Sequence, residues 1–441
     1  MCRDRRNLLF PQFYIQGRYK GSDVDTAKNE RKKTANSERK NTANFERKDA
    51  ANSEKTDRTI KKKPDTENKS FLILFLFLFS SLFLVSILAV FSLIGQTSAI
   101  SGTSIRTSDD AAGFSCEYAE AEKLMPFSDG VLKVASDKIS FLSIMGTERY
   151  TVPVSLSNPK CVISNRYAVV FDYNSYFCSI FDEKGQVFQK QLSGEITYAA
   201  VSESGISAFV LEQQDTKGVV QVLDAKGNIS ASWESRDSGF PVGVTFSEEG
   251  DVLNISLVNA DALVLQAYLR QLSVRTLEDG TVAVENLGSF TLPSGTVFPI
   301  LVPFSDDRIF LGSTSEVVHI RDGRIESSDP LSFPQIYSLF PSGDGVAVLF
   351  SEGVNQEIRF SRVSPSLQKE IDSFLGNSLI STAIYDRFLL VAIDDKLIKL
   401  DMQTGVEITT LHMEEPVIRV GFLDAQAAVV VTETGVREII F

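Results

Sequence analysis

The sequence predicts an all-β protein: a β-propeller of about eight four-stranded blades, preceded by one transmembrane helix and a disordered tail. Beyond residue 110, short β-branched and aromatic runs alternate with Gly, Asp, Asn and Ser clusters about every ten residues. A strand-ending turn recurs at intervals of about 41 residues, a period typical of propeller blades. An apolar run without charges occupies residues 71–95.

The repeated turn sets the blade boundaries. Phe181–Gly185 and Leu223–Gly227 have nearly the same sequence, and Ile320–Gly323 and Leu400–Gly405 continue the series. Each period divides into four runs, and four antiparallel strands form one blade. The expected blades span residues 124–155, 161–192, 198–233, 241–290, 298–326, 336–371, 379–411 and 417–441.

The last of these blades contains only three runs. We expect the segment around Phe114–Tyr118 to supply its outermost strand, because this pairing would close the ring and remove exposed sheet edges. The propeller would then occupy residues 114–441. Eight blades are predicted, and seven is the alternative.

Residues 71–95 are long enough to cross a membrane. At about 1.5 Å per residue, they extend over about 37 Å, whereas the hydrocarbon core is about 30 Å thick. The basic cluster Lys61, Lys62, Lys63 and Lys69 precedes this run, and Arg106 is the next basic residue after it. The positive-inside rule therefore predicts a cytoplasmic N-terminus, a linker at residues 96–113 and a propeller outside the plasma membrane. A signal peptide cleaved near Thr97–Ala99 is the alternative.

Residues 1–70 have a charge balance opposite to that of the rest. They carry 19 Lys and Arg against 11 Asp and Glu, whereas residues 71–441 carry 25 against 46. Residues 21–70 hold few apolar side chains and an eight-residue repeat, and residues 1–70 are therefore predicted to be a basic, disordered cytoplasmic tail. We expect a solvated spacer. Contact with anionic lipid or a cytoplasmic partner is the alternative, and nucleic acid is not an expected partner.

The sequence offers little for catalysis. Cys161 and Cys178 fall on the first and third strands of one blade, too far apart for a disulfide, and Cys116 belongs to the closing strand. His319 and His412 lie in different blades without evident partners. The pairs Asp306-Asp307 and Asp394-Asp395 fall at hairpin turns, where Asp bonds its own backbone. No catalytic residue, metal site or cofactor is therefore predicted.

Several stretches resemble a bacterial family known only as a domain of unknown function, found mostly in clostridial-type Firmicutes. These are Asn158–Asp172, Phe177–Gly185, Ile196–Gly205 and Lys217–Gly227. The resemblance covers about residues 71–441 and implies one membrane helix followed by a propeller. It implies no catalytic residues, and the repetitive tail is not part of it.

The leading functional hypothesis is a non-catalytic binding or scaffold module at the cell envelope. Its partner would be an envelope protein or a cell-wall component, and the hypothesis predicts an exposed patch that loops from several blades form on one face. One alternative is a transmembrane sensor that signals through the basic tail. Another is a hydrolase or lyase with carboxylates at the channel, where Ca²⁺ could also bind.

Overall fold

The computed structural model describes residues 17–18, 112–164, 166–304, 308–326, 329–353 and 356–441. The predicted membrane helix, almost all of the predicted linker and almost all of the tail, with the Lys61–Lys69 cluster, therefore lie outside the described residues. The end of the predicted linker is described, and Gly113 already belongs to strand β2 (Gly113–Ser115). Within the described part of the chain, no helix is long and apolar enough to span a membrane. Of residues 1–111, only β1 (Gly17–Arg18) is described, and it pairs in parallel with a strand at Ile384 and Tyr385.

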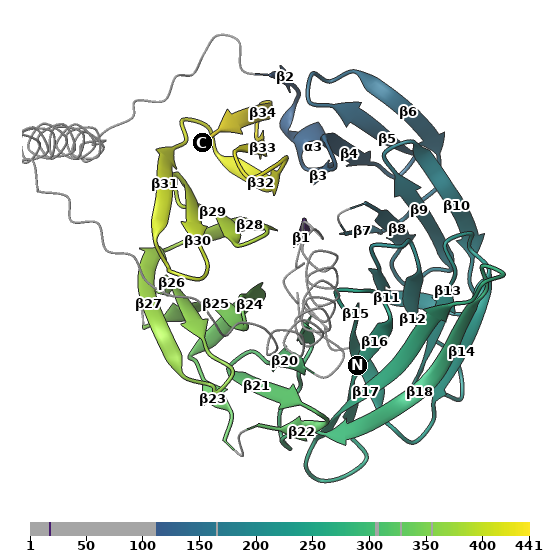
Figure 1. Ribbon diagram of the computed structural model, residues 1–441. Coiled ribbons are helices and arrows are strands. Elements are labelled where there is room, and N and C mark those ends of the chain that lie inside the picture. Colours follow the sequence, from purple (N-terminus) through teal and green to yellow (C-terminus); the bar gives the residue numbers. More distant parts are fainter. Residues whose placement is uncertain (1–16, 19–111, 165, 305–307, 327–328, 354–355) are drawn as a thin grey trace, which may run out of the picture. The chain divides into compact units, whose positions relative to one another are not determined.

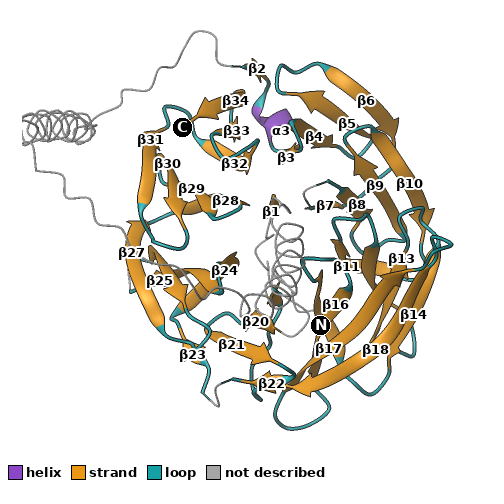
Figure 2. Ribbon diagram, viewed as in Figure 1, coloured by secondary structure: helices purple, strands orange, loops and turns teal. Residues whose placement is uncertain are grey.

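Residues 112–441 form an eight-bladed propeller, as predicted (Figure 1). The blades follow one another around the ring in chain order, and strands make up almost all of it (Figure 2). Blade 8 combines three C-terminal strands with one N-terminal strand. The one described helix, α3 (Tyr118–Ala121), joins that N-terminal strand to blade 1.

Each blade has four strands, numbered here from the channel outward. The innermost strands, from blade 1 to blade 8, are β3 (Leu124–Phe127), β7 (Pro159–Ile163), β11 (Glu195–Val201), β15 (Phe240–Phe246), β19 (Ile300–Pro303), β24 (Gln335–Ser342), β28 (Leu379–Tyr385) and β32 (Val417–Phe422). The second strands are β4 (Gly130–Val134), β8 (Ala168–Asp172), β12 (Ser207–Glu212), β16 (Val252–Asn259), β20 (Arg308–Gly312), β25 (Gly345–Glu352), β29 (Phe388–Ile393) and β33 (Ala427–Thr432).

The third strands are β5 (Lys138–Ser143), β9 (Phe177–Asp182), β13 (Gly218–Leu223), β17 (Gln266–Thr276), β21 (Glu316–Arg321), β26 (Glu357–Val363), β30 (Lys396–Asp401) and β34 (Gly435–Ile440). The outermost strands are β6 (Glu148–Pro153), β10 (Gly185–Gln191), β14 (Ile229–Ser235), β18 (Val282–Thr291), β22 (Arg324–Ile325), β27 (Lys369–Gly376), β31 (Glu407–His412) and β2 (Gly113–Ser115). Blade 5 also carries β23 (Leu331–Ser332), which pairs with β21.

The burial pattern of each strand matches its position within the blade. Every residue of β8 and β33 is buried, because both faces of a second strand pack against neighbouring blades. The outermost strands β6 and β31 instead alternate between exposed and partly buried side chains. The described residues form eight hydrophobic clusters, one for each contact between neighbouring blades.

The predicted ring closure is confirmed. β2 pairs in antiparallel fashion with β34, with Phe114 opposite Val436. The N–H of Cys116 extends this pairing by donating to the carbonyl of Thr434 at 2.9 Å. The N-terminal strand therefore completes the sheet that the last three runs leave short.

The antiparallel order gives the ring two distinct faces. We call the upper face the one where the innermost strand of every blade begins. The loops between second and third strands and the connections between blades lie on this face. The other two kinds of hairpin turn lie on the lower face. Because Ala112 bonds Glu438 near the end of β34 and Cys116 bonds Thr434 near its start, β2 runs from the lower toward the upper face.

Candidate functional site

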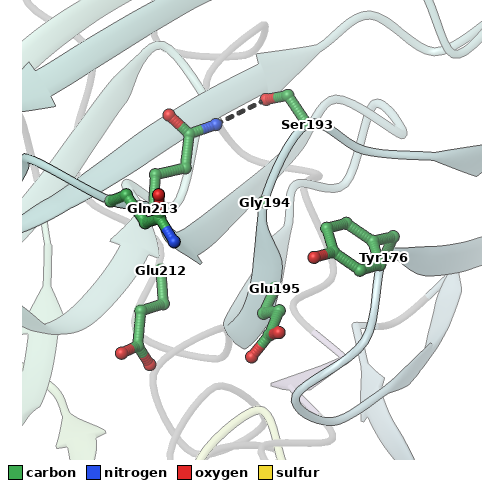
Figure 3. Close-up of a pocket in the computed structure, with 7 residues that line it drawn as sticks. Tyr176, Ser193, Gly194, Glu195, Glu212 and Gln213 are labelled. Carbon is green, nitrogen blue, oxygen red and sulfur yellow. Dashed lines mark hydrogen bonds between the residues drawn. The ribbon is translucent and has the colours of Figure 1, made fainter.

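A pocket of about 540 Å³ opens on the upper face between blades 2 and 3 (Figure 3). The loop between β8 and β9, the connection from β10 to β11 and the loop between β12 and β13 form its walls. Its lining residues are Tyr176, Ser193, Gly194, Glu195, Glu212, Gln213 and Gln214.

Backbone hydrogen bonds between the two blades hold the first wall in place. The N–H of Asn174 donates to the carbonyl of Ile196 at 3.0 Å, and the N–H of Ile196 donates to the carbonyl of Ser175 at 2.8 Å. Asn174 has a φ of +57°, a conformation that asparagine adopts more readily than most residues. The turn of blade 2 is thus fixed to β11, and this fixes Tyr176 beside Glu195 (Figure 3).

The other walls meet at a close approach between Gly194 and the end of β12. A Cβ atom at Gly194 would come within 2.7 Å of both the Glu212 carbonyl oxygen and the Gln213 side chain. Next to it, the Gln213 amide donates to the hydroxyl of Ser193 at 2.8 Å (Figure 3). Glycine is therefore required here for spacing, since any side chain would push the two loops apart.

Two carboxylates form the acidic part of the pocket. Glu195 and Glu212 are direct cross-strand partners in β11 and β12, so their side chains project on the same side of the sheet. In Figure 3 the two carboxylates point in the same direction. No basic side chain among the described residues forms an ion pair with either of them. Like charges placed in this way repel, and a bound cationic group would remove the repulsion.

The surface next to the pocket continues onto blade 4. Lys217, the last residue of the β12–β13 loop, forms an ion pair with Asp261 in the β16–β17 loop. The Asn259 side chain donates to the Asp237 carbonyl at 3.1 Å, which connects the same loop to the start of blade 4. We call the upper face of blades 2, 3 and 4 the blade 2–4 sector.

This sector exposes large apolar side chains. Leu263 at the tip of the β16–β17 loop is fully exposed, Val264 is 54% exposed, and Phe240 and Tyr176 are each 46% exposed. The loop tip is held at its base by the Lys217–Asp261 and Asn259–Asp237 contacts. An exposed apolar surface formed by loops of several blades is what the binding hypothesis predicts.

Some carboxylates elsewhere on the upper face have partners. In blade 6, Arg359 contacts Glu352 at 3.1 Å and Asp372 at 2.8 Å. In blade 8, Glu415 accepts a 2.7 Å hydrogen bond from the hydroxyl of Thr432 and one from the hydroxyl of Thr434, and these bonds lower its pKa. The two pocket glutamates, which have no basic partner among the described residues, therefore differ from these paired carboxylates.

The residues that the sequence singled out lie away from the pocket lining. Cys116, Cys161 and Cys178 are free, as expected, and burial raises the pKa of the Cys161 and Cys178 thiols to about 12. His319 is buried, stacks on Phe310 with ring centroids 4.2 Å apart and has its Nδ1 2.8 Å from the carbonyl of Pro365.

The second histidine and the acidic pairs are surface and turn residues. His412 is exposed, and its Nδ1 lies 3.3 Å from Asp395. Asp394 lies in the β29–β30 hairpin turn, as predicted, with a φ of +52°. Its carboxylate does not bond its own turn as expected but accepts hydrogen bonds from the N–H groups of Asn377 and Ser378, in the connection between blades 6 and 7. Asp306 and Asp307 lie outside the described residues.

Sequence reasoning did not find Tyr176, Glu195 or Glu212. No motif surrounds them, and only the strand register brings the two glutamates together. The described residues hold no group of three or more His, Cys, Asp or Glu that could bind a metal ion.

Several solved structures are similar in fold. BamB from Moraxella catarrhalis is 12% identical with a TM-score of 0.48, and the match covers 74% of this chain and 98% of that one. Sqt1 from Saccharomyces cerevisiae is 13% identical with a TM-score of 0.49, and the match covers 75% and 98%. AztD from Citrobacter koseri is 12% identical with a TM-score of 0.47, and the match covers 66% and 86%. Since no TM-score here reaches 0.5, these likenesses say nothing about what this chain binds.

No curated protein matches the sequence. The match to a protein family spans the whole propeller, from residue 109 to residue 440. The chain therefore belongs to DUF5711, a family of unknown function.

Proposed function

We propose that this chain is a non-catalytic binding or scaffold module, anchored in the plasma membrane by residues 71–95, whose propeller binds a partner outside the cell. The observation that carries the proposal is the blade 2–4 sector, where loops from three blades expose a pocket and apolar side chains on one face. Rigid scaffolds present binding residues on loops in this way. The partner would be an envelope protein or a cell-wall component.

Cysteine labelling tests the anchoring. One set of cells would express the native full chain and another the Leu263→Cys variant. Each set would be treated with a membrane-impermeant maleimide, either intact or after lysis. We expect the cysteine introduced by this substitution to react on intact cells and Cys2 to react only after lysis. If residues 71–95 are instead removed as part of a signal peptide, a tag placed at the N-terminus would be lost from the mature protein.

The position of β1 makes this test decisive. Pairing between β1 and β28 places Gly17 on the propeller side of any membrane, whereas a crossing at residues 71–95 places it on the other side. Both arrangements cannot hold in one molecule. Labelling of Cys2 on intact cells would contradict the proposed crossing and favour the pairing.

A crosslinked pull-down tests the binding role. The full chain and a variant that lacks residues 21–60 would be isolated from crosslinked membranes and their partners compared. We expect both to retain the same partner, because the propeller carries the binding surface. Loss of the partner with the tail alone would contradict this and favour a sensor that acts through the tail.

A further inference from the structure

We propose that the blade 2–4 sector docks a protein segment in which basic side chains lie next to apolar ones. The inference rests on the proposed binding function and deepens it, because it names the face, the sector of the ring and the chemistry of the partner. It commits to a protein partner rather than to a polysaccharide or a lipid surface.

Charge is the first argument. Glu195 and Glu212 stand directly opposite each other on neighbouring strands, and Asp237 nearby is exposed. Among the described residues, none of these three carboxylates has a basic partner. Elsewhere on this face Arg359 forms ion pairs with two carboxylates, so a basic side chain of the propeller neutralises acidic groups there but not these three carboxylates. The partner that complements this sector is a Lys or Arg side chain in reach of the pocket.

Shape and polarity give the second argument. Leu263 and Val264 are exposed on the β16–β17 loop of blade 4 and Tyr176 is exposed at the pocket, all on the upper face, and contacts between blades hold these loops in place. Aromatic and large apolar side chains inside a polar rim are the usual centre of a protein interface. A polysaccharide would match the tyrosine but would not use the exposed leucine and valine. An extended peptide that alternates basic and apolar side chains can use all of them.

The lower face offers a matched surface for comparison. Leu277 is 50% exposed in the β17–β18 turn of blade 4, and Glu249 and Glu278 are exposed on the same face.

Photo-crosslinking in the full chain tests the face and the partner together. A photoreactive amino acid would replace Leu263 in one variant and Leu277 in the other, and both would be irradiated in membranes. We expect an adduct from position 263 and none from position 277. Mass spectrometry of the crosslinked peptide should show Lys or Arg next to apolar residues.

A defined probe measures the charge contribution. A fluorescent peptide of alternating Lys and Leu and a second peptide of alternating Glu and Leu would be titrated onto the detergent-solubilised full chain. We expect only the Lys peptide to bind. The double substitution Glu195→Gln and Glu212→Gln should weaken its affinity about tenfold, which corresponds to about 1.4 kcal/mol. The control pair Glu249→Gln and Glu278→Gln changes the net charge equally on the lower face and should weaken binding less than about twofold.

The outcomes separate this inference from the function on which it rests. Adducts only from position 277 would overturn the inference, but the proposed binding function would stand, with the lower face as the binding face. No adduct from either position would overturn both. Equal weakening by the two glutamine pairs would mean that general acidity, not the sector, attracts the probe, and this also overturns the inference.

Discussion

At the residue scale, the repeated turn has a structural role that connects the blades. The Asp182 and Asp224 carboxylates each accept hydrogen bonds from N–H groups two residues later, which closes the turn after the third strand. At Gly227 and Gly405 the glycine that ends this turn lies against the preceding blade, whereas nothing lies within 4 Å of a Cβ at Gly185. A Cβ at Gly227 would meet Phe188 at 2.7 Å, and one at Gly405 would meet Ile371 at 2.5 Å.

This packing predicts different effects for two glycine substitutions. Gly405 and Gly280 both have a positive φ, +67° and +82°, but nothing lies within 4 Å of a Cβ at Gly280. Gly280→Ala should therefore lower the free energy of unfolding by about 1 kcal/mol, from backbone strain alone. Gly405→Ala should lower it by about 1–3 kcal/mol more, because the methyl group also overpacks against Ile371. Denaturant unfolding measures both, and equal losses would contradict the packing role.

The glutamate pair predicts a gain in stability from losing a charge. Because Glu195 and Glu212 repel each other across β11 and β12, Glu212→Gln should raise the free energy of unfolding by about 0.2–1 kcal/mol. Gln has nearly the same shape, so packing is unchanged. Thermal unfolding of the full chain measures the effect, with Glu278→Gln as a control of equal charge change. A loss of stability would mean that Glu212 has a stabilising contact.

His319 predicts a dependence of stability on pH. Its Nδ1–H donates to the carbonyl of Pro365, and its Nε2 is buried without a partner among the described residues. Burial lowers its pKa, while Glu326 acts in the opposite direction and Arg308 and Arg321 lower it further. Since the unfolded chain binds the proton more tightly, stability should fall as pH drops below about 6.5 and level off below the folded pKa.

One variant isolates this contribution. His319→Phe keeps the stacking on Phe310 and should make the free energy of unfolding less dependent on pH between about 5 and 7. An unchanged slope in His319→Phe would assign the pH dependence to other groups.

At the scale of elements, the closing strand can be tested by a single backbone change. Cys116→Pro removes the N–H that donates to Thr434 next to β2, whereas Cys116→Ala keeps this N–H and removes only the thiol group. We expect the proline variant to be less stable than the alanine variant by about 1–3 kcal/mol, measured by denaturant unfolding. Equal stabilities would show that blade 8 does not depend on this end of the pairing.

The elements were predictable because each strand carries its own signal. Apolar runs and turn residues recur at the blade period, and the three runs at Val417–Phe441 required a fourth strand from elsewhere. Blade 5 was harder, because its outermost strand β22 has only two residues and β23 adds a second short pairing. Strands of that length carry too few side chains for a period to be visible.

The pocket was not predictable, for a physical reason. Glu195 ends a connection between blades and Glu212 ends a hairpin strand, 17 positions later in the sequence. Their meeting depends on strand register, and a shift of one residue would have placed them on opposite sides of the sheet. Tyr176 joins them only through hydrogen bonds between blades. Such contacts cannot be predicted from composition or from the spacing of residues in the sequence.

At the scale of the whole molecule, charge distribution dominates over local ion pairs. Residues 71–441 carry 46 acidic against 25 basic side chains, so the propeller repels itself at neutral pH. Several of its ion pairs are exposed, as in Arg275–Glu285 and Arg236–Glu234, and each such pair contributes at most about 1 kcal/mol. Long-range repulsion is therefore expected to outweigh the attraction that salt would screen.

This balance predicts that salt stabilises the fold. Raising NaCl from about 0.01 M to about 0.1 M shortens the Debye length from about 30 Å to about 10 Å, which screens repulsion across the ring more than contacts at ion-pair distance. The Tm of the full chain at neutral pH should rise by about 1–3 °C. Near pH 4.5, where many carboxylates are protonated, the same change should have little effect. A Tm that falls with salt at neutral pH would show that ion pairs, rather than net charge, control the stability of the ring.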